Sequence, residues 1–169
     1  MSTEVRRVIK SQYGAALEML RQTVLECPDE LWEDGGPNRF WHVAYHALFY
    51  VHLYAQPTES DFAPWARHRQ AHQFLGPVPW PPFDRPEIGE PYTREEIVEY
   101  LDLCRAEVVA RVDAADLEAA SGFEWLPFGK LELLLYSLRH LQHHVGELSG
   151  RLLTETGREV DWVGMRGGG

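Results

Sequence analysis

Lys130-Leu-Glu-Leu-Leu-Leu-Tyr-Ser-Leu-Arg-His-Leu-Gln-His-His-Val-Gly-Glu-Leu-Ser-Gly-Arg-Leu-Leu-Thr-Glu-Thr156 is the stretch that decides the fold of this 169-residue chain. Its apolar residues recur at the three- and four-residue intervals of an amphipathic helix, at Leu131, Leu134, Leu138, Leu141, Val145, Leu148 and Leu152. Gly157 follows as a helix stop. The pattern predicts one long helix over about residues 130–156, with an apolar stripe that packs on other helices.

Three more segments carry helical patterns. Apolar residues at helical spacing predict a helix over Val5–Glu26, and a nearly continuous apolar run predicts a deeply buried second helix over Phe40–Tyr54. Thr93-Arg-Glu-Glu96 has the form of a capping box and begins a third helix that we expect to reach Val112. With the stretch above as the fourth helix, the chain is predicted to be all-α, a four-helix bundle that forms a single domain over residues 1–169.

A connection rich in proline and aromatic residues joins the second and third predicted helices, over about residues 55–91. Its prolines exclude a long regular element; they are Pro57, Pro64, Pro77, Pro79, Pro81, Pro82, Pro86 and Pro91. Its large aromatic side chains indicate that it packs on the helices; they are Phe62, Trp65, Phe74, Trp80 and Phe83. Connections of this length within one domain are usually functional, so we expect a lid or rim over a site.

The composition excludes several functions. Hydrophobic residues make up 44% of the chain and charged residues 25%, which is typical of a globular protein, and no apolar run is long enough to span a membrane. A formal net charge of -10 argues against nucleic acid as a partner. The first residues lack the apolar stretch of a signal peptide, so we expect a cytoplasmic protein. We also expect a homodimer, since an exposed face of an aromatic-rich bundle is readily buried against a second copy.

Two histidines, His140 and His144, lie one turn apart in the fourth predicted helix. Residues four apart share one face of a helix, so the two imidazoles can converge on one metal ion. A second pair at the same spacing, His42 and His46, lies in the second predicted helix, and either residue can supply a third ligand. His46 ranks first because it lies among apolar residues, whereas His42 is near the start of its helix. The alternative is that each imidazole is hydrogen-bonded to a carboxylate or a backbone carbonyl.

The other histidines fit such a site less well. His52 lies about 240° around its helix from His46 and His143 about 60° from His140, so we expect hydrogen-bonded or solvated positions for both. His68 and His72 lie in the proline-rich connection, where we expect surface positions. Three histidine ligands leave one coordination position open, which is typical of a catalytic metal. The chain contains neither the His-Glu-x-x-His motif of zincins nor the Glu-x-x-His motif of di-iron bundles, which excludes both kinds of site.

Three motifs give the chain a resemblance to a known family. They are Tyr45-His46-Ala-Leu-Phe49, Arg139-His140-Leu-Gln-His143-His144-Val-Gly-Glu-Leu148 and Trp162-Val163. With their order and separations, the chain resembles the DinB-like (DinB/YfiT) superfamily of metalloenzymes over most of its length. The resemblance implies a four-helix bundle in which His46, His140 and His144 surround one divalent ion, zinc or nickel first, with iron and manganese as alternatives. Family sequences often have Gln where this chain has Glu147, so a role for Glu147 in orienting a ligand or a water stays open.

The same resemblance implies an activity. Some relatives are thiol-dependent S-transferases or isomerases, in which the metal activates a low-molecular-weight thiol by deprotonating it. We therefore expect a small-molecule substrate and an enzyme whose metal activates a thiol or water, for S-transfer, isomerisation or hydrolysis. Two alternatives are kept: a non-catalytic metal- or ligand-binding bundle protein of a stress response, and haem binding by opposed histidines.

Overall fold

The computed structural model describes residues 2–34, 36 and 38–166. Within these residues the regular structure is helical and contains no strand, which confirms the predicted all-α class. The helices are α1, Ser2–Glu26; α2, Asp29–Trp32; α3, Phe40–Ala55; the short 3-10 helix η1, Glu59–Asp61; α4, Arg94–Ala114; and α5, Lys130–Thr156. No helix in the described part of the chain combines the length and the apolar character needed to cross a membrane.

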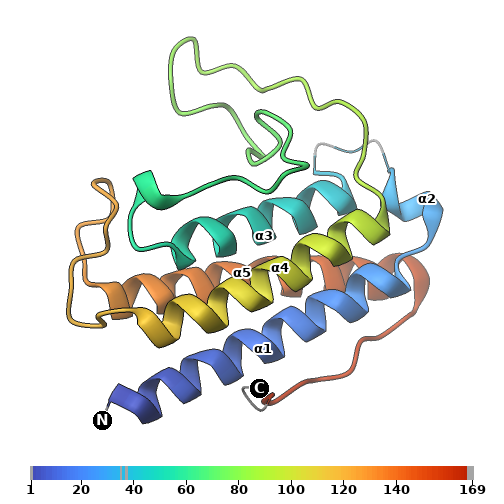
Figure 1. Cartoon of the computed structure of the whole chain (residues 1–169). Coiled ribbons are helices and arrows are strands. Elements are labelled where there is room, and N and C mark those ends of the chain that lie inside the picture. Colours follow the sequence, from blue (N-terminus) through green and yellow to red (C-terminus); the bar gives the residue numbers. More distant parts are fainter. Residues whose placement is uncertain (1, 35, 37, 167–169) are drawn as a thin grey trace.

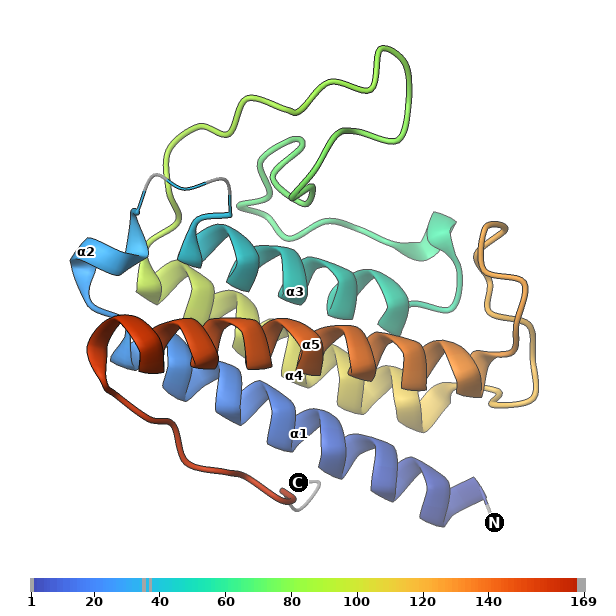
Figure 2. The same ribbon diagram turned by 180° about the vertical axis from the view of Figure 1, so that it is seen from behind.

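The four long helices lie side by side, as Figure 1 and Figure 2 show. α1 packs against α4 and α5, and α3 packs against the same two helices, so α1 and α3 are diagonal neighbours. α3 and α4 run in the same direction, opposite to α1 and α5 (Figure 1). Because α3 and α4 begin at the same end, the chain must return along the full length of α3, and the connection over residues 56–93 does this by passing over its outer side.

α5 turns one face toward the other helices. Its buried apolar residues are Leu133, Leu134, Leu141, Val145, Leu148 and Leu152. The predicted stripe is wrong at Leu131, which is exposed, whereas Leu138 is half-buried and packs against the core. At about 100° per residue, Leu131 lies about 100° around the helix from Leu148, near the middle of the buried face. Gly157 ends the helix with a left-handed φ of 72°, and its amide donates to the carbonyl of Leu153 at 2.9 Å.

α3 is buried on almost every side, as its apolar composition predicts. Within α3, which the structure describes in full, His46 and Tyr50 are the two residues that are not buried. They lie one turn apart and so share one face. α4, α5 and the 56–93 connection cover the rest of the helix. His46 and Tyr50 are therefore the part of α3 that a ligand can reach.

The start of α4 confirms the capping box expected from its sequence. The amide of Glu96 donates to the hydroxyl of Thr93 at 3.2 Å, and the amide of Thr93 donates to the carboxylate of Glu96 at 2.9 Å. Two backbone donors that the first turn would leave unpaired are thereby satisfied. The cap fixes the point at which the long connection ends and α4 begins.

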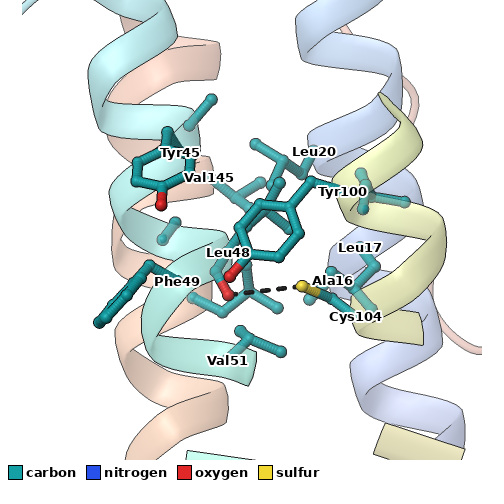
Figure 3. Packing of buried hydrophobic residues seen from close by; sticks show 14 of the residues in the cluster. Ala16, Leu17, Leu20, Tyr45, Leu48, Phe49, Val51, Tyr100, Cys104 and Val145 are labelled. Carbon is teal, nitrogen blue, oxygen red and sulfur yellow. Dashed lines mark hydrogen bonds between the residues drawn. The ribbon is translucent and has the colours of Figure 1, made fainter. Parts of the chain in front are cut away.

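The core between the helices is shown in Figure 3. Leu17 and Leu20 of α1 lie beside Leu48 of α3 and Tyr100 of α4, and all four side chains are fully buried. The thiol of Cys104 donates to the carbonyl of Leu48 at 3.4 Å (Figure 3). Because close-packed protein interiors have low compressibility, this core holds α3 in a fixed place relative to its neighbours.

Aromatic side chains tie the 56–93 connection to the helices. Trp65 stacks on Tyr100 with ring centroids 4.6 Å apart and an interplanar angle of 7°. Tyr92 stacks on Tyr45 of α3 with centroids 4.6 Å apart, and the hydroxyl of Tyr45 is hydrogen-bonded to Nδ1 of His68 at 2.6 Å. Within the connection, the hydroxyl of Tyr92 donates to the carbonyl of Arg67 at 2.7 Å. These contacts place the irregular connection directly over α3, where it forms part of the site described next.

Candidate metal centre

The three histidines expected as ligands lie together where α3 packs on α5. Nε2 of His140 is 3.2 Å from Nε2 of His46 and 3.2 Å from Nε2 of His144. The candidate ligand atoms of all three residues lie within 4.8 Å of one another. His140 and His144 come from successive turns of α5, and His46 faces them from α3. The structure therefore brings all three predicted residues to one point.

The separation of these nitrogens suits a divalent ion. Imidazole nitrogens bind zinc at about 2.0–2.1 Å, so two nitrogens 3.2 Å apart subtend an angle of about 100° at the ion. This angle is close to the tetrahedral value of about 109° that zinc adopts in most protein sites. Three such ligands leave a fourth position for a ligand from outside the protein.

Hydrogen bonds on the far side of two rings decide which nitrogen is free. Nδ1–H of His46 donates to the backbone carbonyl of Gln73 at 2.6 Å, and Nδ1–H of His144 donates to the carboxylate of Glu147 at 2.9 Å. Carbonyl and carboxylate oxygens only accept, so each neutral ring has its lone pair on Nε2. Both lone pairs therefore face the point where the three rings meet. Carbonyl and carboxylate partners of this kind are typical of metal-binding histidines.

His140 lies between the other two rings, and the single N–H proton of its neutral ring cannot satisfy the lone pairs of both neighbours. A neutral ring that carries its proton on Nε2 can share it with one neighbour, so one of the two contacts at 3.2 Å stays a contact between lone pairs. Nδ1 of His140 is itself buried and has no hydrogen-bond partner among the described residues. A divalent ion accepts all three Nε2 lone pairs at once, and in this respect the residues fit a metal.

Burial keeps the three imidazoles neutral near pH 7. It lowers the pKa of His46 to about 3 and that of His140 to about 4. Burial also lowers the pKa of His144, although its hydrogen bond to Glu147 acts in the opposite direction. Neutral imidazole is the form that binds metal ions. A metal therefore binds at neutral pH without a net release of protons from these residues.

His42, the other candidate for third ligand, points elsewhere. It is buried, and its Nε2–H donates to the backbone carbonyl of His72 at 2.7 Å. His46 was ranked first because it lies among apolar residues, and this reason was wrong. His46 is half-buried, and His42 is the more buried of the two. His72, expected at the surface, is also buried, since the connection folds its ring onto Trp41 with centroids 5.9 Å apart.

The remaining histidines lie outside the group of three. His68, expected at the surface, is half-buried through its hydrogen bond with Tyr45, and His52 is buried with its Nδ1 3.2 Å from the hydroxyl of Tyr100. His143 is exposed. It could form a second metal group with His144 and Glu147, but the carboxylate of Glu147 already accepts the proton of His144.

An aromatic cavity adjoins the histidines. The ring of Tyr50 has its centroid 4.9 Å from that of His46 and 5.4 Å from that of His140. Tyr50 and Gln73 also line a cavity of about 750 Å³, bounded by α3, the 56–93 connection and the segment between α4 and α5. Tyr50 and Gln73 thus belong to both features, so the three-histidine group and the cavity share a wall.

Sequence reasoning missed Gln73 and Tyr50, and it expected the connection to form a lid or rim over a site without locating the cavity. Gln73 acts on His46 through its backbone carbonyl, for which the side-chain sequence holds no signal. Tyr50 follows His46 by four residues, and this spacing on a helix was a signal that could have placed it beside the site. Glu147 was considered, and the structure now gives it a defined partner in His144.

Comparisons with known proteins give no further support. No family model matches the chain, no curated protein matches it, and no solved structure matches it. The interpretation of the site therefore depends on the geometry described above and on the motifs in the sequence.

Proposed function

We propose that the protein is a metal-dependent enzyme in which His46, His140 and His144 bind one divalent ion. The observation that carries this proposal is the convergence of three Nε2 atoms, with two separations of 3.2 Å. The donor set of three imidazoles is suited to zinc and nickel, with iron and manganese as alternatives, because selection among these ions depends on geometry and supply.

The proposed chemistry divides between the ion and the chain. When bound, the ion supplies a Lewis acid that lowers the pKa of a thiol or a water molecule toward neutrality, which yields a nucleophile for S-transfer, isomerisation or hydrolysis. The carbonyl of Gln73 and the carboxylate of Glu147 hold two of the rings with Nε2 facing inward. Tyr50 packs against His46 and His140.

We propose further that the four long helices form a four-helix bundle of the DinB-like kind, with the long proline- and aromatic-rich connection between α3 and α4 as its crossover. The motifs that contain His46, His140 and His144 support this proposal. It is also supported by the distribution of the candidate ligands, one on α3 and two on α5.

A homodimer and a cytoplasmic location stay predictions. The homodimer is supported by exposed apolar side chains, among them Leu135 of α5 and Trp162 of the segment after it, which are 52% and 77% exposed. A second copy that covers them would remove this apolar surface from water. Sedimentation at several protein concentrations tests the dimer directly.

The enzymatic proposal is tested with wild type, His140→Ala and the control His143→Ala, each loaded with zinc or nickel. Two reactions are followed: formation of a thioether from a low-molecular-weight thiol and an aromatic electrophile, and hydrolysis of an aromatic ester. We expect wild type and His143→Ala to catalyse at least one of them. His140→Ala should be slower by more than about 100-fold, since loss of even an outer partner of a ligand costs about 10–100-fold. If wild type is no faster than His140→Ala in both, the protein is no such enzyme, and the non-catalytic alternative replaces the proposal.

A further inference from the structure

The cavity next to the three histidines is lined mainly by aromatic rings. Phe49 and Phe62 meet edge to face with centroids 5.3 Å apart, and Phe74 and Trp80 do the same at 5.3 Å. Its volume of about 750 Å³ lies within the range of small-molecule sites, which is about 300–1,000 Å³. Rings arranged in this way present both faces and edges to a ligand, and this arrangement favours a flat, hydrophobic one.

Two tryptophans at the cavity are left open to solvent. Trp80 of the connection is 51% exposed and Trp125, between α4 and α5, is 50% exposed. Large apolar side chains gathered around a hollow, and not scattered singly, are typical of binding sites. Because the two tryptophans come from segments far apart in the sequence, the fold itself assembles this opening.

In the metal-free protein, the charges of the residues that line the cavity disfavour one class of ligand. Among the described residues that line it, Glu59 is the one that carries a charge, and the whole chain carries a net charge of -10. An anionic ligand would find no positive partner there and would be repelled by the carboxylate. A cation, in contrast, is attracted both by Glu59 and by the faces of Trp80 and Trp125.

One polar group of the cavity has no partner. Gln73 lines the cavity, and its side-chain Oε1 is buried without a hydrogen bond among the described residues. A buried acceptor left unpaired is costly, and rotation of the Gln73 side chain toward the cavity would let a ligand that carries a donor satisfy it. The backbone of the same residue accepts the hydrogen bond of His46, which sets this contact beside the three-histidine group.

We infer that this cavity binds a flat aromatic molecule that carries a hydrogen-bond donor and no negative charge, neutral or cationic. The inference rests on the proposed function in that this molecule is the partner on which the activated thiol or water acts, and Tyr50 and Gln73 form the shared wall between the two. The substrate class is then set by the rings of the cavity, and the reaction by the three histidines.

The test measures, by calorimetry, the binding of three probes that share one ring system: 2-naphthylmethanol, 2-naphthylmethylammonium and 2-naphthoate. Metal-free wild type should bind the neutral and cationic probes at least about 10-fold more tightly than the anionic probe. Trp80→Ala and Trp125→Ala should each weaken the two favoured probes by about 3- to 10-fold, as expected for the loss of one aromatic partner. Trp162→Ala, which removes an exposed tryptophan outside the cavity, should bind like wild type.

Two further variants separate this inference from the metal proposal. Glu59→Gln should weaken the cationic probe and leave the neutral one unchanged. His144→Ala should keep probe binding within about 3-fold of wild type although it can no longer hold the metal, because the ring of His144 packs on His46, His140 and His143 and not on a ring of the cavity. Equal binding of all three probes, or equal binding by wild type and both cavity tryptophan variants, overturns the inference and leaves the metal proposal to be judged by metal content alone.

Discussion

His46 donates its Nδ1–H to the backbone carbonyl of Gln73 at 2.6 Å and presents its other ring nitrogen to the histidines of α5. One turn earlier, His42 donates to the preceding carbonyl, that of His72, at 2.7 Å. The spacing of four between these histidines therefore lets α3 hold two successive carbonyls of the connection. Of the two, His46 alone also belongs to the group of three described above.

Alanine substitutions of His42 and His46 should separate the holding of the connection from the binding of the metal. His42→Ala and His46→Ala both leave a carbonyl of the connection without its donor, so amide hydrogen exchange over residues 67–76 should become about 10-fold faster, equivalent to about 1.4 kcal/mol. His42→Ala should keep its metal, whereas His46→Ala should lose it. Exchange that matches wild type in both variants would contradict the role given to these hydrogen bonds.

Replacement of Glu147 tests whether its carboxylate orients His144. Glu147→Ala removes the acceptor of the Nδ1 proton and should weaken metal binding by about 10-fold or more. Glu147→Gln keeps an oxygen at the same position and should bind metal within about 3-fold of wild type. Competition with a chromophoric chelator measures both. An alanine variant as tight as wild type would show that the carboxylate is dispensable.

The buried His42 should make the stability of the protein depend on pH. Burial lowers its pKa from 6.5 to about 4, so the unfolded chain takes up a proton that the folded chain excludes. The contribution of this residue is complete above about pH 6.5 and is lost as the pH falls toward about 4. His42→Gln can still donate to the carbonyl of His72 but does not titrate.

Urea unfolding of the metal-free forms measures this effect. From pH 7 to pH 4.5, the free energy of unfolding of wild type should fall more steeply than that of His42→Gln. The comparison with the variant cancels the contributions of all other titrating groups. Parallel curves would mean that His42 is not protected from protonation in the folded state.

Much of the fold was predictable from the sequence because it depends on local patterns. The capping box at Thr93 and the stop at Gly157 define helix boundaries through hydrogen bonds within a few residues, and both are present. Leu131 was predicted to be buried and is exposed, because it lies about 100° around α5 from the middle of the buried face. The spacing of His140 and His144 places them on one face of the helix. It does not identify the hydrogen-bond acceptors of the histidine rings, because the carbonyl of Gln73 comes from a distant part of the chain.

The path of the connection is the part that sequence patterns could not supply. His68 and His72 look like surface residues in a proline-rich segment, yet they are half-buried and buried because this segment folds back over α3. Long-range contacts of this kind leave no periodic signal. The cavity is built from the same contacts, so it too became visible only in three dimensions.

Gly122 should be sensitive to any side chain. Its φ is +87°, and a Cβ atom would lie 2.0 Å from the carbonyl oxygen of Pro57. Gly122→Ala should therefore destabilise the protein by more than about 2 kcal/mol. Gly150→Ala is the control: it lies within α5 with no atom within 4 Å of the added Cβ, and should stabilise the protein by about 0.5–1 kcal/mol. Thermal and urea unfolding measure both, and equal stabilities would contradict the close approach.

The central claim is that His46, His140 and His144 together hold one divalent ion, and metal content tests it most directly. Wild type, the alanine variants of the three histidines and the control His143→Ala are saturated with zinc, and gel filtration removes the unbound zinc. The zinc content of each protein is then measured by elemental mass spectrometry. Circular dichroism confirms that each is folded. We predict about one ion per chain in wild type and His143→Ala, and less than about one-tenth of that in the other three variants. Equal metal content in all five folded proteins would contradict the claim.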